Sequence, residues 1–443
     1  MTFLSTKRSK SREGGQTVIL ISLLFTIVTT TVVYGMVNPV LKQFSIGQDL
    51  QTSKQSYFAA ESGSEDVYYR IRNNQTTNFP ELLTLDGSTA SSTLTVTGSN
   101  EKQILSTAYN NNIFRTVDKD ITVTDGFAFN FAVQVGLGGL FLNGEGALIR
   151  GNVYSNGPVS GQSTNMIYGD VVSAGSSGSI TNVHATSSAY AHSISNSVVD
   201  RDAYYTSISG TTVNGTLYPS STDQLPVDMP IADSLLDQWE SDALANGLTS
   251  CSGATKYIGS SVTWNAQKIN CNVEISGNNT IITLKGSVWI NGNLTIKNGP
   301  KFKVDDSVGN KSVAILAHSA SSPTTKGRIL LENSPLFYGS ETNGVANPDS
   351  YVMLVSRNTG AESGSGAIAI IAGSNTAGNL LLYAPHGEIR LYNNVVLREV
   401  TGYKLSLFNN TEVLYNIGLA QPLFTAGPGG QWKIKRWRES REH

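Results

Sequence analysis

Histidine is the side chain that most often binds a metal or moves a proton in an enzyme, and this chain of 443 residues has five. None of them forms an HxH or HExxH pair, the spacings at which two imidazoles of one element reach the same ion. The sequence therefore predicts no metal site. The five are His184, His192, His318, His386 and His443.

Paired carboxylates are the second candidate chemistry, because glycan hydrolysis uses one as the acid and the other as the base or nucleophile. The candidates are Asp200 with Asp202, Asp305 with Asp306, and Glu388. Neighbouring positions in the sequence do not set a distance across a substrate, and the second pair precedes serine and glycine, as in a turn. We therefore expect no catalytic residues and no enzyme.

Binding of nucleotides or nucleic acids has little support. Residues 136–139 and 427–430 are glycine-rich, but neither segment leads from a strand into a helix or precedes Lys-Ser/Thr, as phosphate binding requires. Charged residues make up only 14% of the chain, and the formal net charge is -2. We expect no cofactor and no nucleic acid partner.

Cys251 and Cys271 are the two cysteines of the chain. If this part of the chain lies outside the cytoplasm, a disulfide is expected, and closing a loop of about 20 residues would stabilise the fold by roughly 3 kcal/mol. The alternative is a pair of unpaired buried thiols.

The compartment is predicted by the N-terminus, where four basic residues precede an uncharged run. The run begins at Thr17, includes Leu20 and Leu24, and ends at Val37, which is long enough to cross a bilayer. Basic clusters remain in the cytoplasm, so the rest of the chain is expected outside, on a single-pass protein of the cytoplasmic membrane. The basic residues are Lys7, Arg8, Lys10 and Arg12.

The basic leader covers residues 1–15, and the helix is expected to extend over residues 16–75. Thr26 and the threonines at 29–31 are compatible with lipid because their hydroxyls can bond to carbonyls one turn back. Cleavage at Gly15 would leave the apolar helix on the mature protein, unlike cleavage of an ordinary secretory signal.

The order of basic leader, glycine, uncharged helix and Ala59-Ala60-Glu61-Ser62-Gly63 resembles the N-terminal module of type IV pilus minor pilins of the PilX type. The resemblance covers about residues 1–75. It implies that prepilin peptidase cuts after Gly15, that Gln16 becomes the new N-terminus, and that the helix packs among other pilin subunits. A plain signal anchor without a pilus role is the alternative.

Leu20 departs from the pattern of major pilins, which carry a glutamate at the fifth residue after the cut. That glutamate pairs with a neighbour's N-terminus, and Leu20 cannot do so. The resemblance therefore implies a low-copy or tip subunit.

After the helix the sequence predicts a mainly β body: a small β-region over residues 76–135 and a parallel β-solenoid over residues 136–420. Short apolar triplets follow glycine or asparagine, for example at 151–154 and 169–172, which are 18 residues apart, and at 393–397 and 409–414, which are 16 apart. Such spacings suit one coil of a solenoid, with Gly and Asn at left-handed corners and asparagines in ladders. A β-sandwich is the alternative.

A helix is also expected within the body. Residues 231–246 form an amphipathic helix with Leu235, Leu236, Trp239, Ala243 and Leu244 on its apolar face.

Residues 421–443 form a Gly-rich loop and a terminal strand that docks on the body, with Trp432, Ile434 and Arg436 on one face. A basic-aromatic strip that binds an anionic glycan or nucleic acid is the alternative for this strand.

The sequence thus predicts a structural component of a type IV pilus or related secretion filament, anchored in membrane lipid, whose body serves assembly or adhesion at a cell surface. The alternative is a membrane-anchored β-helix protein that binds or cleaves surface glycans.

Overall fold

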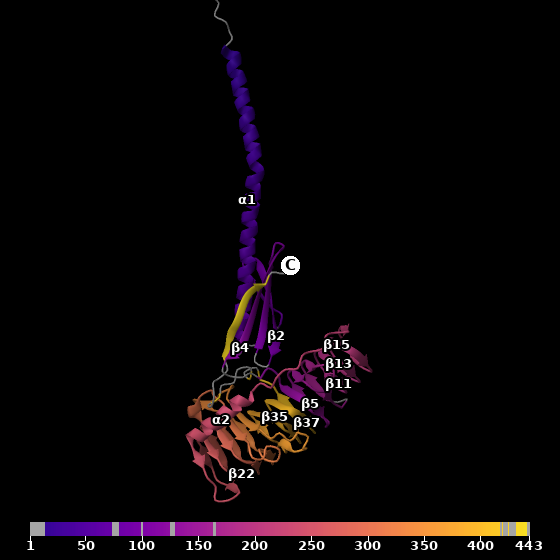
Figure 1. Cartoon of the computed structure of the whole chain (residues 1–443), viewed down its shortest axis with the longest axis vertical. Coiled ribbons are helices and arrows are strands. Elements are labelled where there is room, and N and C mark those ends of the chain that lie inside the picture. Colours follow the sequence, from indigo (N-terminus) through magenta and orange to yellow (C-terminus); the bar gives the residue numbers. More distant parts are fainter. Residues whose placement is uncertain are drawn as a thin grey trace, which may run out of the picture.

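The computed structural model describes residues 14–72, 79–98, 101–124, 129–162, 165–416, 419, 424 and 431–440. Helix α1 (Gly14–Arg72) is continuous through Pro39 and ends beside a small antiparallel sheet, and a larger β body lies beyond that sheet (Figure 1). The chain is therefore mainly β after one long helix, as the sequence predicts.

The small sheet has the order β1-β2-β3-β4-β39, and each neighbouring pair is antiparallel. Its last strand comes from the end of the chain, with Gln431 paired to Thr124. The whole body is thus an insertion between β4 and β39. The strands are β1 (Glu81–Leu85), β2 (Ser88–Gly98), β3 (Glu101–Asn110), β4 (Ile113–Thr124) and β39 (Gln431–Ser440).

The body is a parallel β-solenoid with three faces, and its parallel pairing excludes the sandwich alternative. The predicted spacings of 18 and 16 residues are confirmed by the strand pairing, since Val153 pairs with Val171 and Leu397 with Val413. Other coils are shorter or longer, as Ala189 pairs with Ala203. The corners between the strands differ in length from coil to coil, which explains why the repeat in the sequence is irregular.

The chain does not wind through the solenoid from one end to the other. It starts in the middle with β5, builds a short arm outward to β17, and crosses back over residues 220–247 to the opposite end. From there a long arm winds back to the middle, where β37 pairs with β5 and β38 with β6 (Figure 1). Both connections to the small sheet therefore leave from the middle of the solenoid.

The short arm contains β5 (Val133–Leu142), β6 (Leu148–Arg150), β7 (Val153–Ser155), β8 (Val159–Ser160), β9 (Met166–Tyr168), β10 (Val171–Ser173), β11 (Ser179–Thr181), β12 (His184–Ala185), β13 (Ala189–Ser195), β14 (Val198–Val199), β15 (Ala203–Ser209), β16 (Thr212–Val213) and β17 (Leu217–Pro219).

The long arm contains β18 (Leu248–Thr249), β19 (Thr255–Ile258), β20 (Val262–Trp264), β21 (Gln267–Ile269), β22 (Asn272–Ser276), β23 (Ile281–Leu284), β24 (Val288–Ile290), β25 (Leu294–Lys297), β26 (Lys301–Val304), β27 (Val313–Ala317), β28 (Ile329–Glu332), β29 (Leu336–Tyr338), the hairpin of β30 (Glu341–Thr342) and β31 (Val345–Ala346), β32 (Val352–Ser356), β33 (Ile368–Ala372), β34 (Ala377–Gly378), β35 (Leu380–Leu391), β36 (Val396–Leu397), β37 (Glu399–Leu407) and β38 (Glu412–Leu414).

Asparagines occupy corners of the solenoid, as the sequence predicts. Asn298, Asn333, Asn375 and Asn394 all have positive φ, between 58° and 64°. Their amides form ladders between coils: Asn333 Nδ2 donates to Asn298 Oδ1 at 3.2 Å and Asn394 Nδ2 to Asn375 Oδ1 at 3.1 Å. Asparagine suits these corners because its short polar side chain tolerates the left-handed conformation.

Helix α2 (Asp233–Asn246) lies in the crossover and covers one face of the long arm. Leu236, Trp239 and Ala243 are buried as expected, but Leu244 is 44% exposed and Glu240 is buried. The buried stripe follows the helical spacing 236, 239, 240, 243, which leaves Leu244 beside it. Glu240 can be buried because Arg357 Nη1 lies 2.9 Å and His318 Nδ1 2.8 Å from its Oε1.

Candidate functional site

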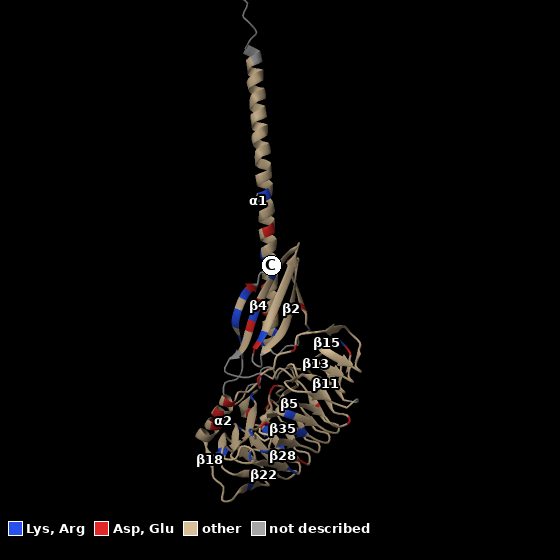
Figure 2. Ribbon diagram, turned by 45° about the vertical axis from the view of Figure 1, so that its right-hand side comes forward, with Lys and Arg blue, Asp and Glu red and all other residues tan. Residues whose placement is uncertain are grey.

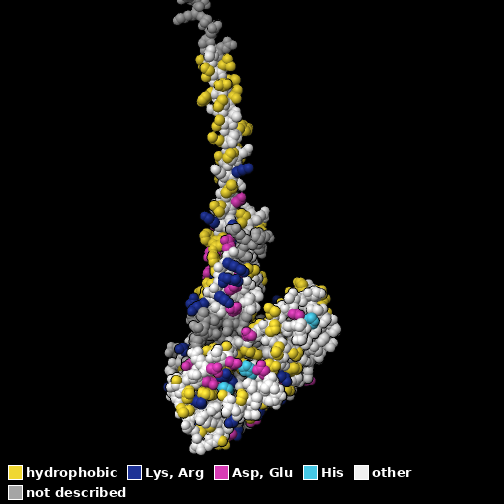
Figure 3. Space-filling model, in the orientation of Figure 1, with side chains coloured by type: hydrophobic (Ala, Val, Ile, Leu, Met, Phe, Trp, Pro, Cys, Tyr) yellow, Lys and Arg dark blue, Asp and Glu magenta, His cyan; other side chains and the backbone are white. Residues whose placement is uncertain are grey.

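The first half of α1 presents apolar side chains on every side. Residues 17–51 are all exposed, among them the predicted membrane residues Thr17, Leu20, Leu24 and Val37 (Figure 3). By length and composition this is a candidate membrane span. A helix that is apolar all round requires lipid or other apolar helices as its surroundings.

The hydroxyls of this half are satisfied within the helix. Thr26 Oγ1 donates to the carbonyl of Ser22 at 2.8 Å, Thr30 Oγ1 to that of Thr26 at 2.7 Å, and Thr31 Oγ1 to that of Ile27 at 2.8 Å. The expected bonding one turn back is confirmed, and these side chains can enter an apolar environment without an open polar group.

The second half of α1 packs on the small sheet through the small residues that the sequence singles out. Ala59 and Ala60 are fully buried against β2, β3 and β4. At Gly63 a Cβ atom would lie 2.8 Å from the Oγ atoms of both Ser92 and Ser106. These positions are small because the helix and the sheet are in close contact there.

Glu61 does not take part in this packing. It is partly exposed and lies near Tyr57, where burial and then the Glu61 carboxylate raise the pKa of the phenol. The acidic residue that does join helix and sheet is Glu65, whose Oε1 lies 2.7 Å from Nζ of the buried Lys119 on β4. The Lys119 ammonium is also 5.9 Å from the Tyr68 ring centroid.

Helix, sheet and terminal strand meet at Trp432. Tyr68 Oη donates to the Trp432 carbonyl at 3.0 Å, and Lys102 Nζ lies 4.7 Å from the centroid of the indole. Burial lowers the pKa of Lys102 to about 8. No ion pair of Lys102 occurs in the described part of the chain, so the ring face is its main favourable contact.

Strand β39 forms the edge of the small sheet and does not dock on the solenoid. Trp432 and Ile434 keep the predicted alternation on one face, but a bulge between Ile434 and Arg436 interrupts it, so Arg436 does not continue that face. Trp432 is buried against α1, whereas Ile434 is exposed. The sequence contains no signal that β39 pairs with β4, because the whole body separates the two strands along the chain.

Three of the four basic residues of β39 pair with acidic residues on the same sheet, so most of the positive charge of the strand is neutralised. Lys435 pairs with Glu101, Arg436 with Asp120, and Arg438 with Asp118 (Figure 2). These pairs fix β39 on β4 and lower the positive potential that an anionic glycan or nucleic acid would meet.

The predicted processing site lies at the start of α1. Gly15 and Gln16 both have helical backbone. The basic cluster at residues 7–12 lies outside the described residues.

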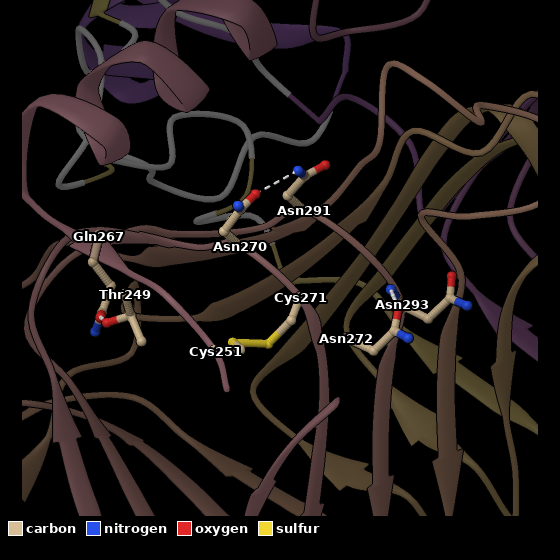
Figure 4. Close-up of a disulfide and its surroundings, with 8 residues drawn as sticks. All are labelled: Thr249, Cys251, Gln267, Asn270, Cys271, Asn272, Asn291 and Asn293. Atoms are coloured by element: carbon tan, nitrogen blue, oxygen red, sulfur yellow. Dashed lines mark hydrogen bonds between the residues drawn. A yellow bond between two sulfur atoms is a disulfide. The ribbon is translucent and has the colours of Figure 1, made fainter. Parts of the chain in front are cut away.

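Cys251 and Cys271 are joined by a disulfide, with their Cα atoms 6.1 Å apart (Figure 4). The bond joins the end coil of the long arm to the next coil. Nearby, Asn291 Nδ2 donates to Asn270 Oδ1 at 2.7 Å and Thr249 Oγ1 to Gln267 Oε1 at 2.7 Å (Figure 4). The disulfide therefore reinforces a coil that has a neighbour on one side only.

The acidic residues considered for catalysis have structural contacts. Asp305 caps a short 3-10 helix (Asp306–Val308) through the backbone N–H of Ser307, at 3.0 Å. Glu388 accepts bonds from Arg390 Nε at 2.8 Å and Ser406 Oγ at 3.0 Å.

Asp200 and Asp202, the first pair considered for catalysis, also have structural contacts. Asp200 contacts His184 at 3.1 Å, and Asp202 accepts the backbone N–H of Thr216 at 2.8 Å. Across the described residues, no group of three or more His, Cys, Asp or Glu is arranged to hold a metal ion.

The solved structures that are similar to this chain include a pilin. No family model matches the sequence, and no curated protein matches it. Among solved structures, the competence-associated pilin ComZ from Thermus thermophilus is similar at 10% identity, over 88% of this chain and 98% of that chain, with a TM-score of 0.26.

Proposed function

We propose that the chain is a structural, non-catalytic subunit of a type IV pilus or related secretion filament. The observation that carries the proposal is the division of α1 into a fully exposed apolar half and a half that packs on a five-stranded antiparallel sheet. The exposed half suits insertion first into lipid and then among the helices of other subunits.

The resemblance of residues 1–75 to minor pilins supports the same proposal. In that module the leader, the apolar helix and the small-residue segment occur in this order, and here Ala59, Ala60 and Gly63 have a packing reason for their size. A motif whose small residues form the helix-sheet contact is better support than composition alone.

The position of the subunit in the filament is proposed from Leu20. Its side chain is exposed and apolar, so it offers no carboxylate to the N-terminus of a neighbouring subunit. We therefore expect a low-copy, minor subunit.

The orientation of the chain and its partners are proposed from the apolar N-terminal helix. The N-terminus lies in the cytoplasm and the body outside, with membrane lipid, pilin subunits and prepilin peptidase as partners. The solenoid is displayed for contact with other subunits or for adhesion to a cell surface or surface glycan.

Mass spectrometry of the full chain after co-expression with a prepilin peptidase tests the proposal. We expect a mature protein that begins at Gln16 and a processing block in Gly15→Leu, whereas Gly14→Ala is the matched control that is still cut. If the leader through Arg12 stays intact in the wild-type chain, the pilin proposal is wrong, and the membrane-anchored β-helix that binds or cleaves glycans replaces it.

A further inference from the structure

The short arm of the solenoid ends in a coil whose outer edge is open. The coil consists of β15, β16 and β17, one strand segment on each face. No strand pairs with the outer edges of Ser207–Ser209, β16 or β17 anywhere in the described structure. Such an edge presents unpaired backbone N–H and C=O groups, to which another chain can add a strand.

The composition of this coil does not protect the edge. Residues 203–222 contain no Asp, Glu, Lys, Arg or His. Leu217 is 51% and Tyr218 40% exposed. Natural edges are commonly protected by charged side chains, and the buried cores of protein interfaces are depleted of charge. The coil therefore lacks the charged side chains that would oppose pairing with another chain.

Within the described residues, the opposite end of the solenoid also has unpaired outer edges, on β18, β19 and β20, but its core ends in a charged residue. One inward column of side chains runs through the body from Lys256 on β19, through Val273 and Leu294, to Ile208 on β15. It is apolar at every coil except the last, where Lys256 lines a hollow of about 380 Å³ beside Ile258 and Trp264. The column thus ends in a lysine at the long arm and in an isoleucine at the short arm, so only the short arm ends in an uncharged core.

A ladder of aromatic rings also ends at the open edge. Tyr190 and Tyr204 stack with centroids 4.5 Å apart, and Tyr204 and Tyr218 stack at 4.4 Å with their planes 3° apart. Each ring covers the face of the one before it, and Tyr218 belongs to the last strand of the ladder. A further ring placed on Tyr218 would extend the stack.

We propose that the end coil of the short arm (residues 203–222) binds the same coil of a second copy of this chain around a twofold axis that passes beside Tyr218, so that the two tyrosine ladders meet. A single extended peptide could pair with one edge only, whereas a second end coil brings three edges around a core of the same cross-section. A head-to-tail contact would instead place Lys256 of one copy on Ile208 of the next, which buries a charge. The twofold contact buries none and is closed, so it stops at a dimer.

The placement of the short arm permits this contact in one membrane. The arm projects to the side of the stalk formed by α1 and the small sheet (Figure 1). Two copies with parallel stalks can therefore bring their short arms together. The contact does not use α1, and the inference does not depend on a role in a pilus.

The oligomeric state of the full chain in detergent micelles, measured by light scattering over a range of concentrations, tests the proposal. We expect a dimer whose dissociation constant increases at least about tenfold in Tyr218→Lys, because the ring on which the partner's ring would stack is lost and a charge takes its place in each copy. Tyr257→Lys is the matched control: Tyr257 lies at the other end, is 73% exposed, and should leave the dimer unchanged. A wild-type monomer at all concentrations would overturn the proposal.

Single-cysteine variants provide a second test that does not depend on the stability of Tyr218→Lys. Both native cysteines are in the disulfide, so an introduced cysteine is the one free thiol. Under mild oxidation we expect Tyr218→Cys to form a covalent dimer and Tyr257→Cys to stay monomeric. Cross-linking only in a mixture of the two variants would show a head-to-tail contact, and no cross-linking would show no contact; either result would overturn the proposal.

Discussion

Lys102 is a lysine whose surroundings oppose its charge. Its side chain is buried beside Trp432, and its pKa is lowered to about 8, against an unfolded value near 10.4. Below pH 8 the amine is charged in both states and the full cost of burying the charge applies. As the pH rises from about 8 to about 10.4, the unfolded chain holds the proton that the folded chain has lost, so this cost is removed and the group's contribution to stability rises.

We therefore expect Lys102→Met to stabilise the protein by about 3 kcal/mol at pH 7 and to have little effect at pH 10.5. Urea denaturation of the full chain in detergent at the two pH values measures the difference between wild type and variant. Lys301→Met, at an exposed position on the solenoid, is the control and should give no pH-dependent difference. An equal effect of Lys102→Met at both pH values would contradict the assignment.

Individual residues of the helix-sheet contact were only partly predictable. Ala59, Ala60 and Gly63 could be found because their sizes match a known module. Lys102 and Lys119 could not, because burial of a lysine depends on partners that are distant in the sequence, here Trp432 and Glu65. A single sequence contains no mark of such a pair.

At the scale of elements, α1 and the small sheet are in closest contact at Gly63. A side chain there would press on Ser92, Ser106 and the Cβ of Ala90, all short groups with little freedom to move. We expect Gly63→Leu to lower the free energy of unfolding of this unit by about 1–3 kcal/mol, measured by denaturation in detergent.

Gly47 provides the matched control, because no atom lies within 4 Å of a Cβ built there. Gly47→Leu should leave stability unchanged or raise it by up to about 1 kcal/mol, since leucine favours the helix more than glycine does. Equal effects of the two variants on stability would show that the contact with the sheet does not explain the glycine at position 63.

The elements themselves were largely predictable, and their partners were not. Short strands after glycine or asparagine, the α2 helix and the corner asparagines follow from local patterns, which are fixed by neighbouring residues. The bulge in β39 and the exposure of Leu244 depend on what lies opposite each element. The pairing of β39 with β4 likewise depends on a segment far away in the sequence.

At the scale of the whole molecule, the insertion of the body between β4 and β39 makes a direct prediction. Thr124 and Gln431 are already paired, so a two-residue Asn-Gly turn can replace residues 125–430 and close a hairpin. We expect this shortened chain to keep α1 and the five-stranded sheet, with dispersed amide signals by NMR in detergent.

A chain that ends at Thr124 is the matched control. It lacks β39, so the nearly buried Asp118 loses its partner Arg438 and Trp432 no longer covers α1. This control should be less stable than the hairpin version by several kcal/mol, because it loses the buried contacts of Trp432 with α1 and the backbone pairing of β39 with β4. If the hairpin version is unfolded as well, the small sheet depends on the solenoid.

The order of coils was beyond prediction from the sequence. The spacing of the repeats sets the size of a coil but not which coils touch. The contact between β37 and β5 joins Val400 to Val133, and no repeat links these two positions. The long crossover interrupts the sequence pattern, although it is the segment that connects the two ends of the body.

This contact between β5 and β37 also sets the order in which the body can be completed as the chain is synthesised. The first coil emerges with one edge open and must wait for nearly all of the remaining body before β37 and β38 arrive to pair with it. Distant pairings of this kind form late, so the middle of the body should be the last part to fold. Until then the edge of β5 is exposed, so an incomplete chain that stops before β37 has an open strand edge in the middle of its body.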